Sequence, residues 1–518
     1  MTATGEHHLA LLAERAFELR GDYPSLLFEG RWHSSAELFD RARGLAAGLA
    51  ELGVAPGDRV VVTMANCPEV TIAYQAIWNA GAVVTPAVFM LPAHDLRHVI
   101  ADSGARAVIT TPELVGKASE AIDGLDHVRA LLCTQPSDGG VLALTEAERA
   151  DPRPIVARSD DDLAALLYTG GTTGRAKGVM LSHANLHFTS SAAHAAAYVP
   201  GVVRALTSLP LSHAYGILVT LAGMHMPERT INVLMRWFEP TAWLELIAEH
   251  ELQHTAVVPT MLQVLLGQPL ERHDLSTLQW ISCGAAPLAP EVELAFTERV
   301  GRVRIRQGYG LTESGALLST NPTELVKPGS VGVPVPGAEI EIRDDADVPV
   351  PRGEIGEICA RSQGIMRGYW RSPDATSEAL ADGWLHTGDL GRLDEDGYLY
   401  IVDRKKDLII RGGFNVYPRD VEDALVQHPH VQMAAVVGRQ SERHGEEVVA
   451  FVSARAGAEI DADELIAWAR ERIGGYRYPR ELHVVDVIPL TPVGKVDRKA
   501  LRARVARGRL KRGWAGPA

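Results

Sequence analysis

The chain has 518 residues, which exceeds the size at which a single hydrophobic core keeps growing, so the sequence predicts more than one structural unit. Its hydrophobic fraction of 46% and charged fraction of 22% are typical of a globular protein and exclude a disordered chain. The 51 basic and 65 acidic residues leave a net charge of −14, which disfavours binding to nucleic acid or to an anionic membrane surface. A bound polyphosphate would therefore depend on local donors and a metal ion.

The cysteines and the N-terminus predict the compartment. Cys67, Cys133, Cys283 and Cys359 are widely spaced and form no Cys-x-x-Cys pair, so we interpret them as small buried side chains in a reducing environment. The N-terminus lacks the basic segment and apolar run of a signal peptide. No apolar stretch approaches the roughly 20 residues that a membrane span needs. We expect a cytoplasmic protein without a membrane span.

In the first half of the chain, apolar runs alternate with helical patterns. Buried strands are predicted at Arg59–Thr63, 81–86 and Ala107–Thr110, and a helix is predicted to begin at Pro68. Strands and helices that alternate at this spacing favour α/β layers with largely parallel sheets.

The pattern changes after about residue 327. Short apolar stretches at 338–342, 357–360 and 398–402 are separated by Gly, Pro and Asp, which indicates small β-rich elements. Beyond Asp403 the pattern predicts strands at 434–437, 448–452 and 482–487 and a helix at 461–473, which is enough for a small α+β unit. The basic run that begins at Arg502 is interpreted as a solvated tail.

The most informative segment, from Leu166 to Val179, reads Leu-Leu-Tyr-Thr-Gly-Gly-Thr-Thr-Gly-Arg-Ala-Lys-Gly-Val. Its glycines let backbone N–H groups converge on an anion, its hydroxyls add donors, and Lys177 supplies a point charge. The segment therefore predicts a phosphate-binding loop. It is not the loop of a P-loop nucleotidase, because Ala176 precedes Lys177 and a strand follows it.

The segment closely resembles the phosphate loop of the adenylate-forming superfamily, which includes acyl-CoA synthetases, aryl-CoA ligases, peptide-synthetase adenylation domains and luciferases. The usual loop reads Tyr-Thr-Ser-Gly-Thr-Thr-Gly-x-Pro-Lys-Gly, and this chain departs from it at Gly170 and Ala176. Further segments resemble family motifs in the expected order and are closest to bacterial fatty- or aryl-acid CoA ligases. They lie at 210–216, 282–288, 307–313, 383–391, 400–407, 411–418 and 489–498.

This resemblance implies an α/β fold with a large multi-layer N-terminal domain and a small mobile α+β C-terminal domain. In the large domain, two sheets would be sandwiched by helices beside a small β-barrel. The resemblance implies a domain over 1–402 that binds ATP and the acid, a hinge at 403–406, and a lid domain over 407–518 that carries the catalytic lysine.

The resemblance also implies which residues hold the nucleotide. Small side chains such as Ala285 would let adenine approach the backbone, Tyr309 offers a stacking face, and Asp389 would accept the ribose hydroxyls. Glu313 and Thr169 would hold Mg²⁺. The implied ATP and AMP site comprises Thr169, Gly170, Gly171, Thr172, Thr173, Gly174, Lys177, Gly284, Ala285, Ala286, Gly308, Tyr309, Gly310, Asp389 and Arg404.

The implied chemistry has two half-reactions. A carboxylate attacks the α-phosphorus of ATP, while Lys495 and Thr312 neutralise the charge that develops. The small domain then rotates about Lys406, and the glycine loop guides the thiol of coenzyme A. The implied catalytic residues are Lys495, Thr312, Glu313 and His213; the acid pocket holds His213, Gly284, Gly308 and Gly310; and the CoA channel holds Arg411, Gly412 and Gly413.

The sequence leaves the substrate and the acceptor open. The acid is a small molecule, fatty or aromatic, and the cofactors implied are ATP, Mg²⁺ and coenzyme A. Two alternatives keep the same adenylation chemistry: loading of a carrier-protein pantetheine, and activation of nitrite for diazotisation of an aromatic amine. A non-enzymatic scaffold is disfavoured because Lys495, Glu313 and Asp389 are all present. Dimers are common in the superfamily, and no residue decides whether this chain forms a homodimer.

Overall fold

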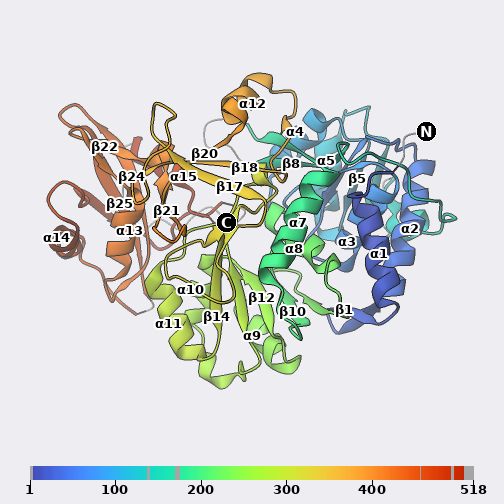
Figure 1. Cartoon of the computed structure of the whole chain (residues 1–518), viewed down its shortest axis with the longest axis horizontal. Helices are drawn as coiled ribbons and strands as arrows, with labels where there is room; N and C mark the ends of the chain where they lie inside the picture. Colours follow the sequence, from blue (N-terminus) through green and yellow to red (C-terminus); the bar gives the residue numbers. More distant parts are fainter. Residues whose placement is uncertain (1–3, 137–139, 170–174, 456, 492–494, 507–518) are drawn as a thin grey trace. The chain divides into compact units, whose positions relative to one another are not determined.

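A computed structural model describes residues 4–136, 140–169, 175–455, 457–491 and 495–506. The chain forms two compact units, one of Met1–Ile340 and Ala360–His386 and the other of Glu341–Cys359 and Thr387–Ala518. The hinge predicted at 403–406 falls within the second unit. The predicted α/β class is confirmed, since both units combine sheets with helices (Figure 1).

A mostly parallel sheet of the first unit contains the strands predicted at 59–63 and 107–110. Strand β3 pairs in parallel with β4 and β5, whereas β8 and β9 are antiparallel. In the order β19-β9-β8-β4-β3-β5-β6-β7, its strands are Gly368–Tyr369, Lys177–Ser182, Leu163–Thr169, Val83–Pro86, Arg59–Thr63, Ala107–Thr110, Ala130–Cys133 and Leu142–Ala143.

Alternate residues of β3 explain why this sheet is covered on both faces. Val60 and Val62 pack in one hydrophobic core with α1, α2 and α3, whereas Val61 packs in another core with α4 and α5. A strand that is buried on both faces needs apolar residues at every position, and 60–62 reads Val-Val-Val. The helices are α1 (Leu9–Arg20), α2 (Ser35–Glu51), α3 (Pro68–Asn79), α4 (Ala93–Ser103), α5 (Val115–Ile122) and α6 (Leu144–Ala147), with the 3₁₀ turn η1 (Pro112–Leu114).

A second sheet of the first unit is parallel through its central strands. Ile281 and Ile305 face α9, α10 and α11 in a common core, so the alternating residues of β13 and β14 face the other way. In the order β16-β15-β14-β13-β12-β10-β11-β1-β2, its strands are Val333–Pro334, Ser319–Thr320, Arg304–Tyr309, Trp280–Cys283, His254–Val257, Arg204–Thr207, Ile231–Leu234, Pro24–Phe28 and Arg31–Ser34.

The remaining helices of the first unit connect these strands. They are α7 (His183–Ala197), α8 (Ala214–Met224), α9 (Pro240–Glu249), α10 (Pro259–Leu266), α11 (Pro290–Val300) and α12 (Pro373–Ala379), with the 3₁₀ turns η2 (Leu270–Arg272), η3 (Thr312–Ser314) and η4 (Ala381–Gly383). Ser182 caps α7 and exchanges hydrogen bonds with Asn185, which fixes where the helix begins after β9.

The β-rich region predicted after residue 327 forms a sheet in the order β17-β18-β20-β21. Its strands are Ala338–Arg343, Gly356–Ser362, Leu385–Leu393 and Leu399–Arg404, and the 3₁₀ turn η5 (Lys405–Asp407) follows the last of them.

The C-terminal part of the second unit has a sheet in the order β23-β22-β25-β24, with β26 paired to β25. Helices α13 and α14 pack on one face of this sheet and α15 on the other. The strands are Phe414–Val416, Ile409–Arg411, Gly445–Ala454, Val431–Ser441 and Glu481–Val484, and the helices α13 to α15 are Pro418–Val426, Ala462–Ile473 and Arg498–Ala506.

Helix α15 corrects one expectation. The basic run from Arg502 was interpreted as a solvated tail, but Arg502 lies in α15 and its Nη2 lies 2.5 Å from the carboxylate of Asp407. Leu501 and Val505 supply the apolar contacts that hold this helix on the sheet, which the charge pattern concealed. The end of the run, at 507–512, lies outside the described residues.

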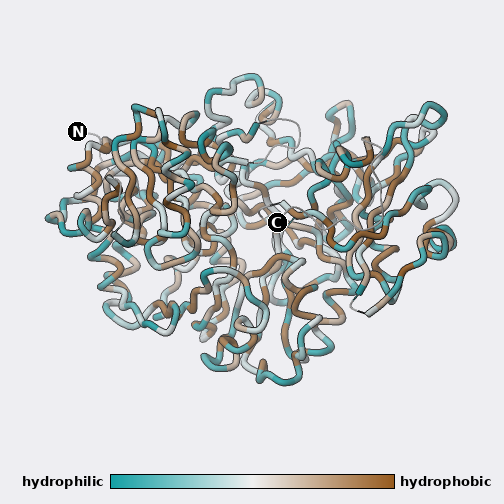
Figure 2. Tube along the Cα trace, turned by 180° about the vertical axis from the view of Figure 1, so that it is seen from behind, coloured by the Kyte–Doolittle hydropathy of each residue, from teal (hydrophilic) through white to brown (hydrophobic). Residues whose placement is uncertain are grey.

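Brown, hydrophobic stretches of the trace lie mostly in the interior, and teal, hydrophilic stretches run along many of the outer loops (Figure 2). Cys67, Cys133, Cys283 and Cys359 are buried free thiols, as predicted. Among the described residues, no helix is both long and apolar enough to cross a membrane.

Candidate active site

The strands predicted on both sides of the phosphate loop are present. Thr169 ends β8, Lys177 begins β9, and the two residues are direct partners in the antiparallel pair. The ends of the loop are therefore held side by side. Gly170, Gly171, Thr172, Thr173 and Gly174 lie outside the described residues.

Tyr369 connects the loop lysine to the glutamate of the 307–313 motif. The Lys177 ammonium lies over the Tyr369 ring, 5.0 Å from its centroid, and the Tyr369 hydroxyl donates a hydrogen bond of 2.8 Å to Glu313 Oε1. Burial, together with the negative charge of Glu313, raises the pKa of Tyr369 well above its usual value, so the hydroxyl keeps its proton. Two predicted residues that are 136 positions apart in the sequence, Lys177 and Glu313, thus share one neighbour.

The backbone around Glu313 is fixed by close packing. Tyr309 ends β14 and Thr312 begins η3, while the Met366 amide donates a hydrogen bond of 2.8 Å to the Glu313 carbonyl. A side chain at Gly310 would lie 2.4 Å from the Ala316 carbonyl oxygen, so only glycine fits there. This packing holds Thr312 and Glu313 at the end of the strand.

The segments predicted to line the acid pocket also meet. His213 is the N-cap of α8, where its Nδ1 accepts a hydrogen bond of 3.3 Å from the Tyr215 amide. A Cβ at Gly284 would lie 3.4 Å from the Gly308 carbonyl oxygen and 3.6 Å from the Tyr215 ring. The glycine turn after β13 therefore lies against both Gly308 and the helix that follows His213. Ala285, next in this turn, has a left-handed φ of 69°.

The residues predicted to contact ribose form an ion pair in the second unit. Asp389 of β20 lies opposite Arg404 of β21, and Arg404 Nε lies 3.1 Å from Asp389 Oδ1. Asp389 is buried, with 5% of its surface exposed. Lys406 follows in η5, where burial and the positive charge of Arg404 lower its pKa.

The predicted CoA-channel residues form a tight hairpin between β22 and β23. Gly412 and Gly413 have φ values of 59° and 83°, a conformation that two-residue hairpin turns require and that glycine adopts readily. Arg411 donates to both carboxylate oxygens of Glu447, at 2.7 and 3.2 Å. Arg411 is thus held against Glu447, a partner that the motif did not indicate.

Lys495 lies in a separate turn of the second unit. The Thr491 amide donates to the Lys495 carbonyl at 2.6 Å, and the Lys495 amide donates to Thr491 Oγ1 at 3.2 Å. Leu490 and Val496 form a bridge beside it. The backbone of the lysine is therefore fixed by hydrogen bonds, while 492–494 lie outside the described residues.

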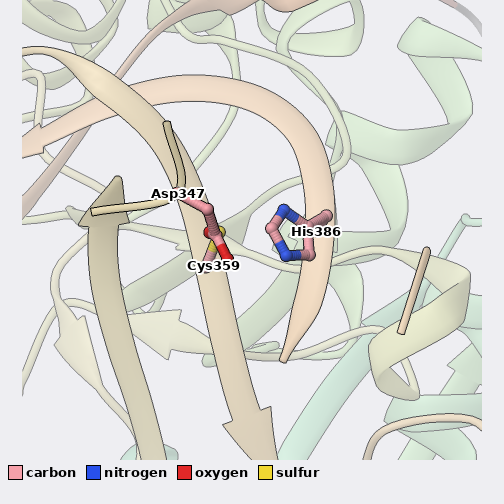
Figure 3. A group of neighbouring side chains, drawn as sticks. All are labelled: Asp347, Cys359 and His386. Atoms are coloured by element: carbon pink, nitrogen blue, oxygen red, sulfur yellow. The ribbon is translucent and has the colours of Figure 1, made fainter. Parts of the chain in front are cut away.

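Figure 3 shows three further side chains that offer metal-ligand atoms, Asp347, Cys359 and His386. The ligand atoms lie within 4.8 Å of one another. Asp347 already forms an ion pair of 3.1 Å with Arg343, and burial raises the pKa of the Cys359 thiol to about 12. We assign this group no metal role.

The motifs contain neither Tyr369 nor any indication of the partners of their own residues. Tyr369 lies in β19, and the sequence Gly368-Tyr369-Trp370 does not indicate that this strand pairs with β9. Arg306 was also missed, because Val-Arg-Ile-Arg at 303–306 predicts a strand with one exposed face and does not separate buried Arg306 from exposed Arg304.

The sequence model described as AMP-binding enzyme matches residues 13–370, and the one described as AMP-binding enzyme C-terminal domain matches residues 420–495. A feruloyl-CoA synthase from Amycolatopsis sp is 37% identical over 90% of this chain and 93% of its own length. A long-chain-fatty-acid–CoA ligase from Salmonella typhimurium is 34% identical over 97% of this chain and 95% of its own.

The fold is similar to solved structures as well. The amide bond synthetase McbA from Marinactinospora thermotolerans superimposes with a TM-score of 0.85 at 32% identity, over 96% of this chain and 99% of that one. The similarity therefore extends over nearly the whole length of both chains.

Proposed function

Because the chain belongs to the AMP-binding enzyme family, we propose that it activates a fatty or aromatic carboxylic acid as its acyl-AMP and transfers the acyl group to coenzyme A. In the first half-reaction the carboxylate attacks the α-phosphorus of ATP, which forms the acyl-AMP and releases pyrophosphate. The acyl group of the mixed anhydride passes to the thiol in the second, which releases AMP.

The Lys177–Tyr369–Glu313 connection is the observation that carries this proposal. It joins the lysine of a phosphate loop to the carboxylate of the 307–313 motif inside one unit, although the sequence separates them widely. Lys177 would balance phosphate charge, and the Thr312 hydroxyl would donate to the α-phosphate. His213 and Gly284 would line the acid beside them.

The donor set around Glu313 fits Mg²⁺. Glu313 is a hard oxygen ligand whose Oε1 is oriented by the Tyr369 hydroxyl, and its Oε2 forms no hydrogen bond with any described residue. Thr169, at the end of β8, adds a hydroxyl. When bound with ATP, the ion would neutralise phosphate charge, and Glu313 and Thr169 would hold it.

The second unit would supply the remaining residues. Lys495 would neutralise charge between the carboxylate of the acid and the α-phosphate, and Asp389 with Arg404 would hold the ribose. After pyrophosphate leaves, rotation about Lys406 would withdraw Lys495 and bring the Gly412–Gly413 turn to the thiol.

The test is AMP release from ATP across a panel of aliphatic and aromatic acids, each with and without coenzyme A. We expect AMP release to require both an acid and coenzyme A, with an acyl thioester as product. AMP release that is indifferent to coenzyme A would contradict the choice of acceptor. A panel in which no acid exchanges radioactive pyrophosphate into ATP would contradict the adenylation itself.

A second acceptor is favoured by one observation, the similarity to a solved amide bond synthetase over nearly the whole chain. In that case an amine would attack the same acyl-AMP, and an amide would form without a thioester. Adding an amine to the panel distinguishes these two acceptors, because the amide and the acyl thioester have different masses. Two further assays complete the experiment. One uses carrier-protein pantetheine as the acceptor, and the other uses nitrite as the activated acid with an aromatic amine as the acceptor.

A further inference from the structure

The face of the β12–β14 sheet that points away from α9, α10 and α11 carries polar residues, of which Arg306 is buried. Register pairs Ser282 with Arg306, and His254 with Trp280, on neighbouring strands. Residues paired in this way share a face, and Ile281 and Ile305 occupy the opposite, apolar one. His254 Nε2 lies 3.0 Å from Ser282 Oγ, which confirms that these side chains lie together.

Arg306 is a buried cation on which the negative charge of Glu324 acts without forming an ion pair. Only 3% of its surface is exposed, and it forms no ion pair with a carboxylate anywhere in the described part of the chain. Its Nη1 and Nη2 donate to the carbonyls of Ala196 and Ala197, at 3.2 and 3.3 Å, at the C-terminal end of α7. Its guanidinium also lies over the Trp280 ring, 4.6 Å from the centroid.

The Nε of this guanidinium has no acceptor in the described part of the chain. Arg306 Nε is buried and has no hydrogen-bond partner among the described residues. A buried donor without an acceptor is costly, and a buried charge more so, so proteins rarely retain one without a role. The capping of α7 accounts for the two Nη groups and leaves Nε unexplained.

The arginine lies beside the segments assigned to the acid. The Tyr215 hydroxyl donates a hydrogen bond of 3.1 Å to the Ser282 carbonyl, and Gly284 packs against the Tyr215 ring. The positive charge of Arg306 acts on both Tyr215 and His254. Burial first, and then this charge, lowers the pKa of His254 to about 4, so the imidazole is neutral and Arg306 is the charged group of the cluster.

We propose that Arg306 is a specificity-determining residue whose Nε donates a hydrogen bond to an oxygen substituent at the end of the acid away from its reacting carboxylate. This inference rests on the proposed acid activation. A hydroxyl, ether or carbonyl oxygen of the acid can accept this hydrogen bond, because Nε has one N–H to donate.

The test compares acids that differ by one oxygen: 3-phenylpropenoic acid with its para-hydroxy and para-methoxy derivatives, and octanoic acid with 8-hydroxyoctanoic acid. We expect the wild-type chain to prefer the oxygenated member of at least one pair by about tenfold or more in kcat/KM for acid-dependent pyrophosphate release. Arg306→Met should reduce this preference to within about twofold, mainly through KM, while the unsubstituted acid keeps its rate.

Arg304→Met is the matched control. Arg304 lies on the same strand and face, and its guanidinium lies 5.4 Å from the centroid of the same Trp280 ring, but Arg304 is exposed. This variant should keep the wild-type preference. Arg306→Lys retains the charge without the Nε geometry and should also lose the preference, which provides a second variant if Arg306→Met does not fold.

Three outcomes would overturn the inference. These are a wild-type chain that treats both members of every pair alike, an Arg306→Met variant that loses rate equally with all acids, and an Arg304→Met variant that loses the preference as well. Equal loss with all acids would assign Arg306 to the capping of α7 alone. A wild-type chain that activates none of the acids would instead contradict the proposed function, so the two failures are distinguishable.

Discussion

At the scale of single residues, the site depends on side chains that the motifs do not contain. Tyr369 orients one oxygen of Glu313 and lies under the Lys177 ammonium, so it sets the position of two groups that would meet the triphosphate. A hydrogen bond to a charged group contributes about 1.5–3 kcal/mol. Losing it would leave Glu313 free to choose other rotamers.

Tyr369→Phe should therefore lower the rate of acyl-AMP formation by about tenfold or more and raise the Mg²⁺ concentration needed for half-maximal rate. Pyrophosphate exchange at varied Mg²⁺ measures both effects. Tyr198→Phe is the matched control, because Tyr198 donates a hydrogen bond of 2.6 Å to Glu228 on other elements. Equal loss in both variants would show that Tyr369 has only a structural role.

Lys495→Ala should reduce acyl-AMP formation by about 100-fold or more, because a charge that meets the transition state is removed. The second half-reaction should be nearly unchanged, since the proposed rotation about Lys406 would withdraw the lysine before that step. Stopped assays with supplied acyl-AMP and coenzyme A measure that step alone. If both half-reactions fall together, Lys495 does not have the proposed role.

At the scale of elements, η5 separates two sets of contacts. Lys405 forms ion pairs with Glu357 at 3.1 Å and Asp345 at 3.0 Å, which tie it to the β17–β21 region. Asp407, two residues later, is paired with Arg502 of α15. Lys406 is the residue between these attachments, which supports its assignment as the pivot.

Helix α13 also contacts β21 across this point. Asp403 accepts a hydrogen bond of 2.9 Å from the Arg419 amide, and Arg419 Nη1 donates to the Ile401 carbonyl at 2.7 Å. Burial raises the pKa of Asp403 to about 6. A rotation about Lys406 must break these bonds, so they favour the arrangement described here.

Lys406→Pro should spare acyl-AMP formation and slow thioester formation by at least about tenfold, because proline fixes φ near −65° and removes the rotation. Lys406→Ala removes the same ammonium but keeps the backbone free, so it is the control for the charge. Single-turnover assays measure the rates of acyl-AMP formation and thioester formation separately in each variant. Normal thioester formation by the proline variant would contradict the hinge assignment.

At the scale of the whole molecule, buried neutral histidines make the first unit sensitive to acid. His8 and His183 stack with ring centroids 4.2 Å apart, and both are fully buried. Burial lowers the pKa of His8 to about 4 and the pKa of His183 well below its usual value. His225 and His254 also have pKa values lowered to about 4, mainly by burial.

A lowered histidine pKa in the folded state means that the unfolded chain binds protons first on acidification. For a histidine whose pKa is lowered to about 4, the stability from that group is fully present above about pH 6.5 and is lost as the pH falls towards 4, by up to about 3 kcal/mol. Urea unfolding between pH 7.5 and 4.5 should show this loss. His8→Asn keeps an N-cap for α1 but cannot titrate, so it should have a shallower pH dependence. An unchanged slope would contradict this assignment.

The sequence by itself determined the local features of this protein. The Val-Val-Val run at 60–62 is apolar at every position, so it predicts a strand that is buried on both faces. The Gly-Thr segment before Lys177 predicts an anion-binding loop, which stays a prediction because 170–174 lie outside the described residues. The motifs follow one another in the order that is usual in the adenylate-forming superfamily, and this order predicted both the family and the α/β class.

The tertiary structure decided the contacts between distant segments. That Tyr369 joins Lys177 to Glu313, that Arg411 is held by Glu447, and that Arg502 returns to Asp407 all depend on which strands and helices become neighbours. A hydroxyl or guanidinium group can donate to any acceptor within hydrogen-bond distance, so the residue type alone does not specify its partner. Only the fold selects that partner, because strand pairing and core packing fix which side chains come within hydrogen-bond distance.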